Sequence, residues 1–401
     1  RCYQLFRVFD SALKIEGKIM KKLETKQWLP LIGMTLAAFI FNTSEFMPIG
    51  LLTSIAAAFS ISESQAGIMI TAYSWAVMIL SVPLMIAVSK VSFKPMLLVT
   101  LVVFAFGQIL SGIAPTFLIL IIARLIVASA HAIFWSVASV IAVKLVDEQH
   151  RDFAMSMIVT GTSIAMIFGL PLGRIVGLYL GWRMTFILAG IIAFALFAFQ
   201  SFVFPTLDKP EPFKVNQLPL LFKNKSLVSI FIVSFLFATA YYTAYSYIEP
   251  FMSSIAKLSD TWITLSLSMF GVAGILGSVL FSKFYSKNRV GFLRLMTLNI
   301  AIVLLLLKPS TVSLISLLCV CAYWGLTSTA FNVAAQSEII LHADAAGSVA
   351  MAFFSGIFNL GIGTGSFIGG KVVDLINLGS IGYIGAVIGL LAGIYCILST
   401  K

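Results

Sequence analysis

Long apolar runs separated by short polar segments fill the chain from residue 29 to residue 398. A helix of about 20 apolar residues crosses the roughly 30 Å hydrocarbon core of a bilayer, and the chain contains twelve runs of this kind. The pattern therefore predicts an all-α membrane protein with twelve transmembrane helices. The predicted spans are residues 29–57, 64–87, 95–113, 116–143, 153–177, 182–204, 226–254, 261–282, 291–307, 313–339, 347–373 and 380–398.

A proline- and lysine-rich segment divides these spans into two sets of six. Residues 205–225 contain four prolines and four lysines, a composition typical of a linker. We therefore predict one six-helix bundle over residues 29–204 and a second over residues 226–398. The segment 205–225 between them is predicted to lie in the cytoplasm.

The segment before the first span, residues 1–28, is also predicted to be cytoplasmic. It contains Met20 followed by two lysines, which has the form of a natural start. We therefore treat residues 1–19 as a candidate non-native extension and leave them out of the fold prediction.

The composition excludes a soluble domain of this length. Hydrophobic residues make up 60% of the 401 residues, charged residues only 10%, and the mean hydropathy is +1.05. A soluble protein of this size needs far more charge to cover its surface. The sequence also has no nucleotide-binding Gly-Lys loop, no His-Glu-x-x-His pair and no repeated channel filter. We therefore expect no enzyme, no channel and no cofactor.

The net charge of +11 is best explained by membrane topology. Most of the 26 Lys and Arg residues fall in segments that share one side of the membrane if the chain alternates through twelve spans. The segments on the other side contain only Arg183, Lys257, Lys308 and Lys371. This asymmetry marks the cytoplasmic side and places both termini there. We expect a lipid bilayer rather than nucleic acid as the partner of these charges, and a monomer as the working unit.

The four cysteines predict neither a metal site nor a disulfide. Cys319 and Cys321 lie two residues apart in an apolar run, so they point to different faces of a helix and cannot easily share a ligand or a bridge. Cys2 and Cys396 lie far from both in the sequence. No zinc-binding spacing is present.

Each half carries a glutamate close to a proline in its first span. Glu45 precedes Pro48, and Glu249 precedes Pro250. A carboxylate inside a membrane span is costly and usually functional. Its recurrence in the first span of each half suggests two related bundles around a shared cavity near the membrane midplane, which is the plan of a secondary transporter.

Glu45 is the first candidate for proton coupling. Asn42 lies three residues before it and therefore shares its helix face. A carboxyl group that meets the membrane interior in one conformation and water in another can bind and release a proton. The alternative is a structural carboxylate that is permanently paired with a basic residue.

A polar stripe in the fourth span supplies the second candidate. Arg124, His131 and Trp135 lie at i, i+7 and i+11 and share one face, which we expect to be lined by water. Histidine titrates in the physiological range, so we predict that His131 handles protons together with Glu45. Arg124 is either the charge partner of a carboxylate or a clamp on backbone carbonyls.

The seventh span carries the features expected of a sugar site. Tyr241, Tyr245 and Glu249 lie at i, i+4 and i+8 on one predicted helix face. Tyrosine rings pack against sugar C–H groups and their hydroxyls donate to sugar oxygens, although a tyrosine stripe can also serve packing alone. The neutral amide of Asn359 fits an uncharged ligand. Asn42 and Trp135 complete the predicted substrate-binding set.

Small residues in the fifth span predict close helix packing. The segment GTSIAMIFGLPLGRIVG places small residues at three- and four-residue spacing, so that helix backbones can approach closely. Pro171 predicts a kink. We assign structural or gating roles to Gly169, Pro171, Gly173 and the adjacent Arg174.

Several stretches resemble the bacterial sugar efflux transporters of the major facilitator superfamily, in its twelve-helix drug:proton antiporter branch. The similar stretches are AAFIFNTSEFMPIGLLTSIA, AHAIFWS, GLPLGRIVGLYLGWRMTF, YYTAYSYIEPF and MAFFSGIFNLGIG. The resemblance implies an inner-membrane exporter of arabinose and galactoside-type compounds that is driven by the proton gradient. It also implies that Arg124 is the buried arginine of the fourth-helix motif, and that Gly169, Pro171 and Gly173 belong to the antiporter motif of the fifth helix.

Two departures from this resemblance are visible. The loop SKVSFKPML keeps Lys90 and Lys94 but lacks the acidic residue usual in the superfamily's loop motif, and Leu170-Pro171 stands where Gly-Pro is usual. Because of the first departure, we do not expect the charge latch that this loop usually forms between the two bundles. A multidrug or nucleoside exporter of the same fold remains the alternative to a sugar exporter.

Overall fold

The computed structural model describes residues 24–88, 90–207, 218–343 and 347–399. Within this part of the chain, 12 helical segments are long and apolar enough to cross a membrane. The predicted all-α class and the predicted number of spans are therefore confirmed. Most of the N-terminal segment 1–28 and the middle of the predicted linker lie outside the described residues.

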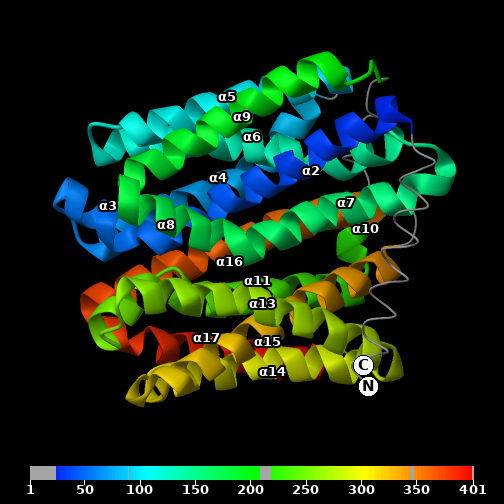
Figure 1. Cartoon of the computed structure of the whole chain (residues 1–401). Helices are drawn as coiled ribbons and strands as arrows, with labels where there is room; N and C mark the ends of the chain where they lie inside the picture. The colour runs from blue at the N-terminus through cyan, green and yellow to red at the C-terminus, as the bar shows by residue number, and fades with distance from the viewer. Residues whose placement is uncertain (1–23, 89, 208–217, 344–346, 400–401) are drawn as a thin grey trace, which may run out of the picture.

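The first half consists of six spans, two of which are interrupted or extended by other helix types (Figure 1). Its elements are α2 (Thr25–Phe46), η1 (Met47–Leu51), α3 (Leu52–Phe59), α4 (Glu63–Val88), α5 (Phe93–Ile113), α6 (Phe117–Lys144), η2 (Glu148–His150), α7 (Arg151–Ile164), η3 (Ala165–Gly169), α8 (Leu170–Leu180) and α9 (Trp182–Val203).

The second half repeats this plan after a short helix within the predicted linker. Its elements are α10 (Leu218–Lys223), α11 (Lys225–Tyr245), α12 (Ile248–Pro250), η5 (Phe251–Ile255), α13 (Asp260–Phe284), η6 (Tyr285–Lys287), α14 (Arg289–Leu307), η7 (Pro309–Val312), α15 (Leu314–His342), α16 (Gly347–Leu375), η9 (Leu378–Ser380) and α17 (Ile381–Ser399).

Prolines explain where the spans depart from α-helical geometry. Pro48 is the second residue of the 3₁₀ segment η1, and Pro250 directly precedes the π-helical segment η5. Pro171 directly follows the π-helical segment η3 and Leu170. Proline has no N–H to donate and its ring clashes with the preceding turn, so the helix must change its hydrogen-bonding pattern nearby. Both glutamates predicted from the sequence therefore lie at breaks in their helices.

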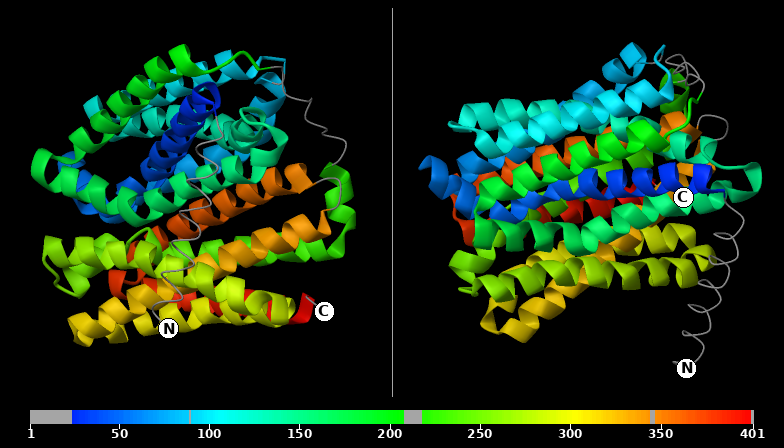
Figure 2. Two further views of the ribbon diagram at one scale, coloured as in Figure 1. Left: turned by 45° about the vertical axis from the view of Figure 1, so that its right-hand side comes forward. Right: turned by 45° about the horizontal axis from the view of Figure 1, so that its top comes forward.

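Each half has its own apolar core. In the first half, the ring of Phe41 stacks on Phe104 and Phe134 with centroids 4.0 Å and 4.3 Å apart. In the second half, Phe237 stacks on Phe331 at 3.7 Å. The helices of the two halves lie in layers one above the other in Figures 1 and 2.

The two halves meet along two seams. Helix α4 packs against α16, and α13 packs against η3 and α8. Gly271 in α13 lies so close to Ile167 in η3 that a Cβ atom there would overlap the Ile167 backbone. Only glycine allows two helix backbones to approach this closely. We name the two ends of the molecule by the elements that lie there, the α3 end and the α10 end (Figure 1).

Candidate functional site

Glu45 and His131 face each other inside the first half. Glu45 lies at the end of α2, where the span breaks, and α6 places His131 opposite it. Glu45 Oε2 lies 3.7 Å from His131 Nε2, and the two side chains are 10% and 3% exposed. The His131 ring lies against Tyr73 and Trp135, with centroids 5.6 Å and 6.1 Å away. The pair is therefore a buried acid and base that aromatic rings shield from solvent.

Arg124 clamps the backbone at the end of α2. Its Nη2 donates to the carbonyl oxygen of Ser44 at 3.1 Å, and its Nη1 donates to the Ser44 hydroxyl at 3.4 Å. Pro48 lies four residues after Ser44 and has no N–H, so the Ser44 carbonyl lacks its usual helical donor. Arg124 replaces that donor. Its guanidinium also lies 4.3 Å from the centre of the Tyr73 ring, in cation–π contact.

The expectation of a water-lined face in the fourth span is wrong for this conformation. Arg124 and His131 are both buried, and Trp135 packs on His131 and Phe134. Of the two interpretations of Arg124, the structure supports the clamp on a backbone carbonyl. The stripe faces α2 rather than a cavity, and the spacing of its residues cannot distinguish these two surroundings.

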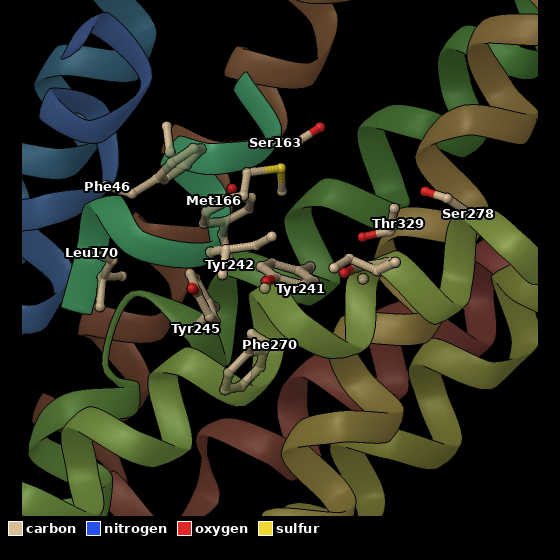
Figure 3. Close-up of a pocket in the computed structure, with 16 residues that line it drawn as sticks. Phe46, Ser163, Met166, Leu170, Tyr241, Tyr242, Tyr245, Phe270, Ser278 and Thr329 are labelled. Atoms are coloured by element: carbon tan, nitrogen blue, oxygen red, sulfur yellow. The ribbon is translucent and has the colours of Figure 1, made fainter. Parts of the chain in front are cut away.

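A pocket lies between the halves near the middle of the spans (Figure 3). It contains about 700 Å³ of space, including its open mouth. All 16 lining residues are uncharged. They are Phe46, Ser163, Ala165, Met166, Ile167, Leu170, Tyr241, Tyr242, Tyr245, Phe270, Gly271, Gly274, Ile275, Ser278, Ser328 and Thr329.

The two walls of the pocket differ in chemistry. The first half contributes mainly apolar side chains such as Phe46, Met166 and Leu170, whereas α11 contributes tyrosines (Figure 3). Tyr241 and Tyr245 both line the pocket, with ring centroids 4.8 Å apart. The sequence pattern had identified these two tyrosines. It missed the apolar lining residues, because single apolar residues in apolar helices carry no distinguishing signal.

Glu249 lies apart from this pocket. The predicted shared face of Tyr241, Tyr245 and Glu249 is interrupted, because α11 ends at Tyr245 and Glu249 belongs to the separate turn α12. Its carboxylate instead accepts hydrogen bonds from Arg174 at 3.0 Å and from the Thr53 hydroxyl and amide at 2.7 Å and 3.1 Å. Arg174 and Thr53 both belong to the first half.

The other predicted substrate ligands also lie outside the pocket lining. Asn42 donates to the Thr162 carbonyl at 3.3 Å and so joins α2 to α7. Asn359 in α16 donates to the Ser355 carbonyl of its own helix at 3.1 Å. Of the six residues predicted to bind substrate, the two tyrosines line this pocket and the other four do not.

The predicted motif glycines pack the fifth span onto the break in the first. A Cβ atom at Gly169 would overlap Thr43, and one at Gly173 would lie 2.9 Å from the Met47 Cβ. Pro171 lies between them in the first turn of α8. These contacts allow η3 and α8 to run directly alongside the end of α2 and η1.

Metal-ligating side chains are not grouped in the described part of the chain, which holds no cluster of three or more His, Cys, Asp or Glu that could bind a metal ion. Cys319 is exposed and Cys321 is buried. They therefore point to different faces of α15, as their spacing predicts.

Comparisons with known proteins agree with the observed fold of twelve membrane-spanning helices. The model of the family described as "Major Facilitator Superfamily" matches residues 34–350. The structure of a bacterial homologue of the human lysosomal transporter Spinster, inward-facing and unoccupied, is similar with a TM-score of 0.69 and 13% identity, over 94% of this chain and 96% of that one. The human organic anion transporter MFSD10 (TETRAN) is similar with a TM-score of 0.66 and 15% identity, over 93% and 100%.

Proposed function

The chain belongs to the major facilitator superfamily, and on this premise we propose that it exports sugars in exchange for protons. The family and the twelve spans support membrane transport rather than catalysis. The resemblance noted in the sequence supports an export direction and a bacterial inner membrane, and the uneven distribution of Lys and Arg supports cytoplasmic termini. In that orientation the α3 end faces outward and the α10 end faces the cytoplasm.

The uncharged pocket supports a neutral, hydroxyl-rich cargo. An ionised substrate would be left without a counter-charge among the lining residues, at a high cost in free energy. Tyr241 and Tyr245 can stack on the C–H face of a sugar and donate to its hydroxyls. Ser278 and Thr329 offer further hydroxyls on the same side of the pocket (Figure 3). Arabinose and galactoside-type compounds have this chemistry.

The observation that carries the proposal is the position of the Glu45–His131 pair. The pair is buried, and Glu45 is the direct neighbour of Phe46, which lines the pocket. A change of charge at Glu45 therefore occurs one residue away from the cargo site. It also occurs at the break between α2 and η1, where the backbone has already left α-helical geometry.

In the proposed cycle, protonation and cargo alternate on the same carrier. A proton from outside neutralises the Glu45–His131 pair when the α3 end is open and sugar leaves. The carrier then reorients, the proton passes to the cytoplasm, and sugar enters again from the α10 end. The proton and the sugar each bind more tightly to one of the two conformations, open at the α3 end or open at the α10 end. Binding or release of either ligand therefore shifts the balance between these conformations.

The test uses the purified chain in proteoliposomes with labelled arabinose and an imposed proton gradient. The expected result for the natural chain is gradient-driven movement of arabinose, which Glu45→Gln reduces to the rate seen without a gradient. The matched control is Glu148→Gln, because Glu148 is an exposed carboxylate at the surface. Transport that ignores the gradient in both the natural chain and Glu45→Gln would refute proton coupling.

The aromatic and apolar lining also favours a second candidate, an exporter of drugs or nucleosides. Phe46, Phe270 and Met166 offer the kind of wall on which flat hydrophobic compounds bind. Overproduction of the chain in a drug-sensitive bacterium distinguishes the two candidates. Resistance to hydrophobic compounds without any change in sugar accumulation would support the second candidate and contradict the first.

A further inference from the structure

Arg174 joins the two halves through two carboxylates. Its Nη1 lies 3.0 Å from Glu249 Oε1 and its Nη2 lies 2.7 Å from Asp260 Oδ1. Its Nη1 also donates to the Gly50 carbonyl at 2.6 Å, which fixes the guanidinium within the first half. Glu249 and Asp260 both belong to the second half. We call Arg174, Glu249, Asp260 and Thr53 the Arg174 network.

The two carboxylates in this network have different environments. The Glu249 side chain is 5% exposed and that of Asp260 is 66% exposed, while Arg174 is 3% exposed. Breaking a buried ion pair by removing one partner leaves an uncompensated charge and costs far more than breaking an exposed pair. Thr53 donates both its hydroxyl and its amide to Glu249. Of the two carboxylates, Glu249 therefore contributes more to the contact between the halves.

A second set of contacts joins the halves at the same end. The Ser64 hydroxyl in α4 donates to Asp374 in α16 at 2.8 Å, and the Ser366 hydroxyl donates to the Gly67 carbonyl at 3.3 Å. The apolar contacts agree with this placement. The first-half residues that belong to the core cluster of the second half are Ile49, Leu52, Ala56, Ala66, Ile70 and Leu170, all from the part of the first half nearest the α3 end.

The α4–α16 seam loosens toward the α10 end. At Gly370, near the α3 end, an added Cβ atom would lie 2.7 Å from the Tyr247 hydroxyl and 3.0 Å from the Ser64 hydroxyl. At Gly356, toward the α10 end, the nearest atom would be Met78 Cγ at 4.0 Å. The structure is therefore a conformation in which the α3 end is closed and the halves are held together there.

We propose that the Arg174 network is the latch of the α3 end, and that the Glu249 carboxylate sets the balance between its closed and open conformations. The halves can separate at this end only if Glu249 leaves Arg174 and Thr53. In the open conformation water would solvate both charges, so the latch controls an equilibrium rather than locking one state. This role differs from the sugar contact that the sequence pattern assigned to Glu249.

The Arg174 network provides an ion pair between the halves although the loop after the second span departs from the usual pattern. That loop lacks the acidic residue of the usual charge latch between the bundles. Here an arginine of the fifth span and a glutamate of the seventh supply an ion pair between the halves at the opposite end from that loop.

The test measures the opening of the α3 end directly. Nitroxide labels are attached at Ala58→Cys in α3 and Leu375→Cys at the end of α16, in the full chain whose four natural cysteines are replaced by serine. Pulsed electron spin resonance then gives the ratio of long to short distances in nanodiscs, without sugar and without a proton gradient. Failure of the latch and failure of the proposed sugar export are therefore separate results.

The comparison of Glu249→Gln with Asp260→Asn decides the outcome, because each removes one carboxylate charge from the same arginine. We expect Glu249→Gln to raise the ratio of open to closed α3 ends by about tenfold or more, and Asp260→Asn by less than about threefold. If the effect of Glu249→Gln does not exceed that of Asp260→Asn by at least about threefold, the proposal is overturned.

A second variant keeps the proposal testable if Glu249→Gln fails to fold. Thr53→Val removes only the hydroxyl donor to Glu249 and keeps the shape of the side chain. It should shift the same distances in the open direction, because a hydrogen bond to a buried charge contributes to the closed state alone. An unchanged distance distribution in Thr53→Val would contradict the latch.

Discussion

The two buried glutamates lie in the first span of each half, yet their partners are of different kinds. Glu45 faces His131 within the same half at 3.7 Å, whereas Glu249 faces Arg174 across the interface at 3.0 Å. A pair within one half can change its charge without any movement of the halves. A pair between the halves must break when they move. The same residue type therefore suits a proton carrier in one half and a mechanical contact in the other.

The chemistry of the partners strengthens this contrast. Histidine gains and loses a proton in the physiological range, whereas arginine remains charged in nearly every protein environment. The Glu45–His131 pair can therefore exist in several charge states, but the Glu249–Arg174 pair is suited to one. Four substitutions test this contrast between the two glutamates.

Removal of Arg174 should have the largest effect on stability. Arg174→Ala leaves the buried Glu249 carboxylate without its counter-charge, so we expect a loss of about 3–5 kcal/mol in the free energy of unfolding. Arg151→Ala is the control, because Arg151 pairs with Glu148 at the surface with side chains 52% and 83% exposed, and should cost less than about 1 kcal/mol. Thermal unfolding in detergent measures both. Equal losses would show that the Arg174 pair is no stronger than a surface pair.

Removal of the Thr53 hydroxyl should have the next largest effect. Thr53→Val deletes a hydrogen bond to a buried carboxylate and should destabilise the closed α3 end by about 1.5–3 kcal/mol. Ser64→Ala deletes a comparable bond to Asp374, which is exposed, and should cost less than about 1 kcal/mol. The distance measurement between α3 and α16 gives both values. If Ser64→Ala shifts the distance distribution further toward open than Thr53→Val does, the α4–α16 seam, rather than the Arg174 network, is the main contact that holds the α3 end closed.

Removal of the basic partner of Glu45 should affect coupling rather than opening. His131→Gln keeps a hydrogen-bonding side chain but cannot titrate, so gradient-driven sugar transport should fall by about tenfold, which equals about 1.4 kcal/mol. Exchange of sugar across the membrane without a gradient should persist. The control is His342→Gln, because His342 forms a similar pair with Glu338 near the α10 end. An equal fall in gradient-free exchange would assign His131 a structural role.

Removal of one pocket hydroxyl should have the smallest effect. Tyr245→Phe keeps the aromatic ring in the pocket and loses its O–H, so the apparent affinity for arabinose should fall by about threefold to tenfold, equivalent to roughly 0.5–1.5 kcal/mol. Tyr179→Phe is the control, since Tyr179 is 85% exposed on the outer surface of α8. Competition assays in proteoliposomes measure both. An unchanged affinity in Tyr245→Phe would remove this hydroxyl from the proposed sugar site.

Local sequence features predicted which residues need a partner, but not always which partner they have. Pro48 indicates that the Ser44 carbonyl lacks a helical donor, yet nothing near it in the sequence points to Arg124, which lies in another span. Glu249 and Arg174 lie 75 residues apart, and periodicity cannot connect them. The predicted stripe of Tyr241, Tyr245 and Glu249 is one turn too long, because it requires a continuous helix, whereas α11 ends at Tyr245.

The twelve spans, and the need for their buried charges to be compensated, can be inferred from the amino-acid sequence. Both follow from local properties, since about 20 consecutive apolar residues suffice to cross a bilayer and any charge within them is costly wherever it lies. The pairing of Glu45 within its half and of Glu249 between the halves becomes visible only in the folded structure. That choice depends on how α2, α6, α8 and α12 pack in space, and packing joins residues whose distance in the chain carries no information about their contact.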